Sequence, residues 1–198
     1  MNFLGHAWLS PSGAEILVGN FTADFVGAKP PAHWTENCIH GWTLHRAIDQ
    51  FTDQHPAFKR LKSELFPHVG HYASVLVDLW LDHILAADWE QMNPDTPSLN
   101  EFCSYTYKEL QSAEGYFPQR FSGVFQRMYK ENWLEGYAKP QGMYATLEGL
   151  AYRSSGFAPY LEKFQGPQFL VDVLTHSQHP MRNEGRQLLQ DACNAFRP

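Results

Sequence analysis

The apolar residues of this chain follow a helical period rather than the alternation of a β-strand. Its 20 leucines outnumber the 12 valines and isoleucines together, and stretches that alternate apolar and polar residues are hard to find. β-Branched residues are enriched in strands, whereas leucine is a good helix former. Both observations predict an all-α protein.

Prolines and capping residues divide the apolar pattern into separate helices. A long helix should end before His55-Pro56, because the residue that precedes proline is pushed out of helical geometry. Pro56 suits the first turn of the next helix, and Ser98 with Glu101 forms a capping box. The predicted helices cover residues 33–53, 57–66, 72–90, 98–113, 118–134, 143–152, 167–175 and 181–196.

The joins between these helices are too short to be linkers between domains. The chain also lacks internal repeats and low-complexity tracts. At 198 residues it is long enough for one compact domain with a real core and short for two. We therefore expect residues 1–198 to form a single compact helical domain.

Charge and cysteine content narrow the class of protein. The 15 basic and 21 acidic residues give a net charge of −6, which argues against a nucleic-acid partner. Cys38, Cys103 and Cys193 form no Cys-x-x-Cys pair, so we expect no disulfide framework and no thiolate zinc site. No apolar run approaches a membrane span, and the first residues do not resemble a signal peptide. These features predict a cytoplasmic protein without a membrane partner.

Several common catalytic motifs are absent. The sequence contains no Walker-type phosphate loop, no Gly-x-Gly-x-x-Gly, no Gly-x-Ser-x-Gly and no His-Glu-x-x-His. His176 and His179, beside Pro180, are either ligands or part of a polar loop.

The helix predicted over residues 72–90 is apolar nearly all round, yet it carries Asp78, Asp82 and His83. A helix of this pattern is buried, and a buried carboxylate is costly unless it is paired or bound to a metal. These side chains are therefore either metal ligands or partners of an arginine or of a neighbouring helix end.

A second polar group lies on the helix predicted over residues 33–53. His45 and Asp49 are four residues apart and share a face, and Asp53 lies a further turn on. Imidazole and carboxylate together form a ligand set for divalent metals, although a helical surface pair would look the same. Asp24 and His6 sit in apolar surroundings of their own, where Asp24 could also be a turn or cap residue. Ligands that project from separate helices are typical of metal sites in helical bundles.

Four segments resemble the acyl carrier protein phosphodiesterase family in order and spacing, namely Met1–His6, Gly19–Val26, Leu44–Pro56 and Val77–Trp89. The resemblance implies an all-helical fold distantly similar to the HD-domain phosphohydrolases. It also implies hydrolysis of the phosphodiester that joins 4′-phosphopantetheine to a serine of holo-acyl carrier protein, a step of lipid metabolism and fatty acid biosynthesis. A divalent metal is implied as well, with manganese expected and magnesium or iron(II) as alternatives. The HD doublet has histidine first, whereas here Asp82 precedes His83.

The expected site follows from these residues and that resemblance. The expected metal ligands are Asp24, His45, Asp49, Asp82 and His83, with His6 and Asp53 as further candidates. In metal-assisted hydrolysis, Asp24 or Asp78 would take the proton of the attacking water. His45 or Arg46 would steady the phosphate, Arg46 through its forked donors.

Two other functions stay open at this point. One is a metal phosphohydrolase that acts on a nucleotide or another small phosphodiester, and the other is a non-catalytic helical binding protein. For an acidic carrier protein, the predicted docking patch is Arg120, Arg127 and Lys130, which return to nearly one face of their helix. Lys59, Arg60 and Lys62 form a second basic cluster, and solvated surface charge is the plainer reading of both.

Overall fold

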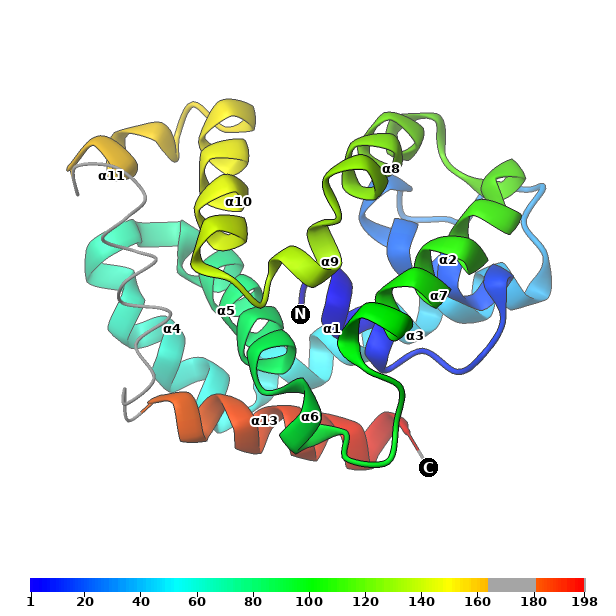
Figure 1. The fold of residues 1–198 in the computed structure, drawn as a ribbon. Coiled ribbons are helices and arrows are strands. Elements are labelled where there is room, and N and C mark those ends of the chain that lie inside the picture. The colour runs from blue at the N-terminus through cyan, green and yellow to red at the C-terminus, as the bar shows by residue number, and fades with distance from the viewer. Residues whose placement is uncertain (164–180, 198) are drawn as a thin grey trace.

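In a computed structural model, which describes residues 1–163 and 181–197, the chain is helical and no described residue lies in a strand (Figure 1). The prediction of an all-α fold is confirmed. None of the described helices is long and apolar enough to cross a membrane. The elements are α1 (Phe3–Trp8), α2 (Ala14–Thr22), η1 (Ala23–Phe25), α3 (Glu36–Gln54), α4 (Pro56–Val69), η2 (Gly70–Tyr72), α5 (Ala73–Ala87), α6 (Trp89–Met92), α7 (Leu99–Ser112), η3 (Glu114–Tyr116), α8 (Gln119–Glu131), α9 (Trp133–Gly136), α10 (Pro140–Arg153), α11 (Ala158–Lys163) and α13 (Met181–Phe196).

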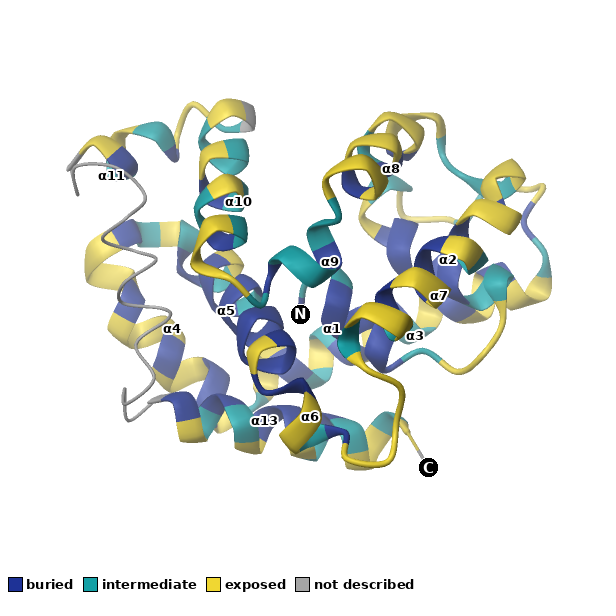
Figure 2. Cartoon of the chain, viewed as in Figure 1, coloured by how far each residue is buried: buried dark blue, intermediate teal, exposed yellow. Residues whose placement is uncertain are grey.

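Helix α5 lies near the middle of the molecule, and helices from both ends of the chain pack on it. α1, α4 and α13 all contact it. Most of its residues are buried, among them Leu76, Trp80 and Ile84, as the dark blue ribbon of Figure 2 shows. Asp82 and His83 are buried with them. The buried apolar surface of α5 thus fixes where the short helix α1 can lie.

Helices α2 and α3 approach so closely that neither contact position has room for a side chain. A Cβ atom added to Gly19 would lie 2.0 Å from the carbonyl oxygen of Cys38. One added to Gly41 would lie 2.0 Å from the carbonyl oxygen of Ile16. The two glycines therefore let the backbones of the two helices touch.

The ends of α3 show how local chemistry sets the boundaries. The helix begins at Glu36, three residues later than predicted, because the Thr35 hydroxyl accepts a hydrogen bond from the Cys38 N–H at 3.2 Å and caps it. It ends before Pro56, as predicted, and His55 is extended there. Helix α4 runs past its predicted end to Val69.

Two of the predicted helices are each broken into two. The helix predicted over 72–90 is interrupted at Asp88, and the helix predicted over 118–134 at Asn132. Asn132 takes the left-handed conformation, with φ of 48°, which asparagine tolerates better than most residues. The capping box of Ser98 and Glu101 and the helix over 181–196 are confirmed. The helix predicted over 167–175, with His176 and His179, lies outside the described residues.

Helix α13 is tied to the end of α5 by a buried ion cluster. Asp88 accepts hydrogen bonds from Arg182 and Arg186, each at 2.8 Å. Arg182 and Asp88 are both buried, and the two arginines lower the pKa of the Asp88 carboxyl against the opposing effect of burial. Removing the carboxylate would leave a buried guanidinium without its counter-charge.

We expect Asp88→Ala to lower the free energy of unfolding by about 3 kcal/mol, because Arg182 then stays buried and unpaired. Urea unfolding followed by circular dichroism measures the change. Glu184→Ala is the matched control. Glu184 also lies on α13, but its ion pair with Arg60 of α4 is exposed, so the loss should cost below about 1 kcal/mol. Equal costs for the two variants would show that the Asp88 cluster does not anchor α13.

Candidate metal centre

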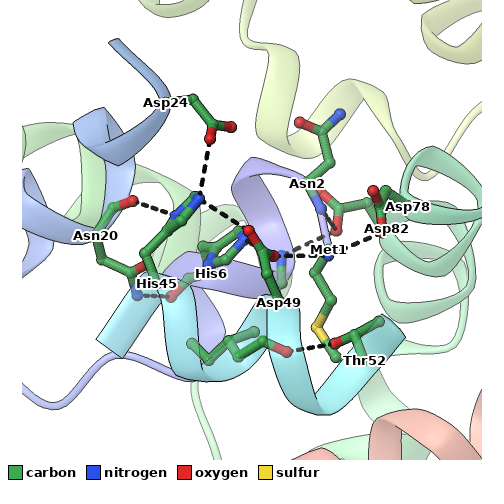
Figure 3. A network of polar contacts seen from close by, with 12 residues as sticks. Met1, Asn2, His6, Asn20, Asp24, His45, Asp49, Thr52, Asp78 and Asp82 are labelled. Atoms are coloured by element: carbon green, nitrogen blue, oxygen red, sulfur yellow. Dashed lines mark hydrogen bonds and ion pairs between the residues drawn. The ribbon is translucent and has the colours of Figure 1, made fainter. Parts of the chain in front are cut away.

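Polar side chains from α1, η1 and α3 converge beside α5 (Figure 3). His6 comes from α1, Asp24 from η1, and His45 and Asp49 from α3. One nitrogen of each histidine and one oxygen of Asp49 lie within 4.8 Å of one another. Such a group could hold a metal ion, and we call these four residues the cluster.

His45 presents an unpaired ring nitrogen to two carboxylates. Its Nδ1–H donates to the carbonyl oxygen of Asn20 at 2.7 Å, so the other nitrogen, Nε2, carries the lone pair in the neutral ring. Nε2 lies 3.0 Å from Asp49 Oδ2 and 3.4 Å from Asp24 Oδ1. This buried atom has no hydrogen-bond partner of good geometry among the described residues. Three electron-pair donors that face one point require a cation or a proton between them.

The ring of His6 stacks on that of His45, with centroids 4.0 Å apart and planes at 12°. Its Nε2 lies 3.1 Å from Asp49 Oδ1, and its buried Nδ1 finds no partner in the described part of the chain. Burial lowers the pKa of His6 to about 4, although Asp49 opposes that shift. His6 is therefore a neutral imidazole near pH 7, which is the form that binds metals.

The carboxylates give the cluster an excess of negative charge. Burial raises the pKa of Asp49, but the nearby imidazoles of His45 and His6 outweigh that effect and hold the pKa well below its usual range. The imidazole of His45, 3.4 Å away, also lowers the pKa of Asp24, whose side chain is 80% exposed. Burial disfavours protonation of His45, but Asp24 and Asp49 raise its pKa to about 9. At neutral pH the metal-free protein therefore keeps a proton on His45, beside the carboxylates of Asp24 and Asp49.

Asn20 connects three helices and was missed by sequence reasoning. Besides accepting from His45, it donates from its side-chain amide to the His6 carbonyl oxygen at 3.0 Å and to Ser10 Oγ at 2.7 Å. It is fully buried on the otherwise apolar helix α2. A polar residue inside that apolar stretch is the signal that could have identified it.

Asp78 lies at the edge of the cluster and faces the amino group of Met1. That group is 2.9 Å from Asp78 Oδ1 and 3.4 Å from Asp49 Oδ1. Burial raises the pKa of Asp78, and the positive charge of Met1 acts against the shift. Asp78 therefore already has a cationic partner.

The carboxylate of Asp82, a predicted metal ligand, contacts the first turn of α1. Its carboxylate accepts backbone hydrogen bonds from Asn2 at 3.2 Å, Leu4 at 2.7 Å and Gly5 at 3.0 Å. These donors are the orphan N–H groups of a helix start. Asp82 is fully buried, and its oxygens point at α1 rather than at His45. These contacts correspond to the helix-end role that was the alternative to metal binding in the sequence analysis.

Three other predicted residues lie apart from the cluster. The His83 Nδ1–H donates to the Tyr137 carbonyl oxygen at 2.7 Å, because adjacent residues on a helix project about 100° apart. Asp53 is exposed one turn beyond Asp49. Arg46 is exposed as well, with its guanidinium carbon 4.0 Å from the ring centroid of Trp42.

Comparison with known proteins places the chain in a family. The family model for acyl carrier protein phosphodiesterase matches residues 1–192. The chain belongs to the acyl carrier protein phosphodiesterase family. It is accordingly an enzyme of the hydrolase class. No solved structure matches it significantly.

Several relatives share the family name. Proteins named acyl carrier protein phosphodiesterase from Enterobacter sp. (strain 638) and from Klebsiella pneumoniae are each 33% identical over 153 residues. One from Salmonella agona is 32% identical over the same length. Each alignment covers 77% of this chain and 79% of the relative. The phosphodiesterase family match includes every residue of the cluster.

In this phosphodiesterase, Asp82→Ala and Asp49→Ala should differ in how much they destabilise the metal-free fold. Asp82→Ala strips three backbone N–H groups of their acceptor and should lower the free energy of unfolding by about 2–3 kcal/mol. Asp49→Ala removes a carboxylate that is 39% exposed but pairs with His6, His45 and the Met1 amino group, and should cost about 1 kcal/mol. Urea unfolding in the presence of a chelator measures both. A larger loss for Asp49→Ala would contradict the assigned roles.

Proposed function

We propose that the chain is a metal-dependent phosphodiesterase of the cytoplasm that releases 4′-phosphopantetheine from holo-acyl carrier protein. Family membership supports the reaction, since the matching relatives are named for it. The observation that carries the metal is the convergence of His6, His45 and Asp49, whose ligand atoms lie within 4.8 Å of one another and include the buried Nε2 of His45. We further propose that residues 1–198 act as a single domain.

His6, His45 and Asp49 are the proposed ligands of one divalent ion. Two imidazoles and a carboxylate suit manganese, iron or zinc better than magnesium, which prefers oxygen donors. We propose manganese. The Asn20 carbonyl oxygen orients the His45 ring, as outer partners of metal ligands commonly do.

The bound ion would polarise a phosphoryl oxygen and lower the pKa of water at the site. We assign Asp24 as the residue that takes the proton of the attacking water, because its carboxylate is exposed and borders the ligands. Asp78 is less suited to this role, since the Met1 amino group already contacts it. Arg46, which follows His45 on α3 and is exposed, is proposed to donate its forked N–H groups to the phosphate.

Two conservative variants separate metal binding from proton transfer. Asp49→Asn should weaken Mn²⁺ binding at least about tenfold, because a charged ligand is lost. Asp24→Asn should bind Mn²⁺ within about threefold of wild type and lower kcat at least about 100-fold. Calorimetry measures the affinity, and the loss of the phosphopantetheine mass from holo-acyl carrier protein measures the rate. Full activity in the presence of a strong chelator would refute the metal, and an unchanged kcat in Asp24→Asn would refute its role.

The proposed carrier surface is the outer face of α8. Arg120, Arg127 and Lys130 are exposed there, while Phe121, Phe125 and Met128 on the opposite face are buried. Acyl carrier protein is acidic and this chain carries a net charge of −6, so a local basic patch is needed for their encounter.

Reversing two of these charges should weaken docking without altering the chemistry. The double variant Arg120→Glu with Lys130→Glu should raise KM for holo-acyl carrier protein at least about fivefold, leave kcat unchanged and flatten the salt dependence of kcat/KM. Lys59→Glu with Lys62→Glu on α4 is the matched control, with exposed residues and the same change of charge. Equal KM values for both double variants would move the docking surface away from α8.

A further inference from the structure

A groove of about 370 Å³ lies between α5, α8, α9 and α10. Figure 1 shows α8 and α10 standing on either side of α9, with the amino terminus below them. The volume falls within the range of small-molecule sites. Residues from α1 also line the groove, so five helices contribute to it.

The walls of the groove combine apolar surface with a few hydrogen-bonding groups. Val75, Leu79 and Leu150 supply branched aliphatic contacts, and Val75 is 44% exposed. Asn2 and Thr146 add polar atoms to this surface. Such a lining suits a ligand that alternates methyl-bearing and amide segments.

One end of the groove adjoins the cluster. Asn2 and Phe3 line the groove, and Phe3 lies one helical turn before His6 on α1. Met1, next to Asn2, contacts Asp49. On α5, Val75 and Leu79 flank Asp78. A molecule whose phosphate reached the cluster could therefore extend directly into the groove.

The rim of the groove also meets the proposed carrier surface. Arg127 both belongs to the basic patch on α8 and lines the groove. A carrier protein docked on that patch would thus lie beside the groove and the cluster at once.

We propose that this groove binds the pantetheine arm of the substrate while the phosphodiester lies at the cluster. The inference rests on the proposed function. The arm is a linear chain with a dimethyl-bearing carbon, two amides and a terminal thiol, which matches the mixed lining. Because the arm is joined to the reacting phosphate, it needs a groove near the cluster, and Phe3 of this groove lies on the same short helix as His6.

Binding can be tested without catalysis. Free pantetheine, which lacks the phosphate, is titrated into metal-free protein while tryptophan fluorescence is recorded, since Trp133 lines the groove. Trp133→Phe identifies the part of the signal that comes from the groove. Ala145→Phe and Val75→Phe narrow the groove from opposite walls, and both positions are exposed enough to accept the larger side chain. Glu148→Phe, exposed on α10 and outside the groove, is the control.

We expect wild type and Glu148→Phe to bind pantetheine with affinities within about twofold, and the two narrowing variants to bind at least about tenfold more weakly. No saturable binding to wild type, or equal binding by all variants, would overturn the inference.

Hydrolysis of holo-acyl carrier protein separates this inference from the proposed function. If the groove holds the arm, Ala145→Phe raises KM and Glu148→Phe does not. Turnover with equal KM in both variants would refute binding of the arm in the groove but would not contradict the proposed function. Pantetheine binding without any hydrolysis by the Mn²⁺-loaded wild type would refute the proposed function but would not contradict binding in the groove.

Discussion

The contact between α2 and α3 is the constraint on which the cluster depends. At Gly19 and Gly41 the two backbones approach to a distance that no Cβ atom would allow. The same close approach brings the carbonyl oxygen of Asn20 within 2.7 Å of His45 Nδ1. That hydrogen bond fixes the tautomer and rotation of His45, and so aims Nε2 at Asp24 and Asp49. Gly19 and Gly41 therefore determine the orientation of the His45 ring.

The second support of the cluster comes from α5. Its two carboxylates have different roles, although they are one turn apart on the same helix. The Asp82 carboxylate accepts hydrogen bonds from the backbone of α1, whereas Asp78 stays partly exposed beside Met1. Three backbone N–H donors offset the cost of burying the Asp82 carboxylate. Its structural contribution is to hold His6 over the ring of His45.

The parts of the site that sequence reasoning could predict are those set by local geometry. The four-residue spacing of His45 and Asp49 on one helix face is such a case, and so is the helix end before Pro56. The outcome for Asp82 could not be predicted, because its choice between an ion and the α1 backbone depends on a contact across 78 residues. His83 was predicted as a ligand because it adjoins Asp82. Its ring contacts the carbonyl oxygen of Tyr137, which lies outside the helix predicted over residues 72–90. Asn20 was missed since its contact with His45 uses a backbone carbonyl oxygen, an atom that every residue carries and that no sequence pattern marks.

Helix α1 has only six residues, and an isolated helix of that length is not stable in water. All members of the cluster lie within the first 49 residues, yet the acceptor that holds α1 in place is Asp82. A nascent chain that has exposed His6, Asp24, His45 and Asp49 therefore still lacks the geometry that joins them. Folding of α5 therefore completes the cluster, so the geometry proposed to bind an ion arises late in synthesis and only in a correctly packed molecule.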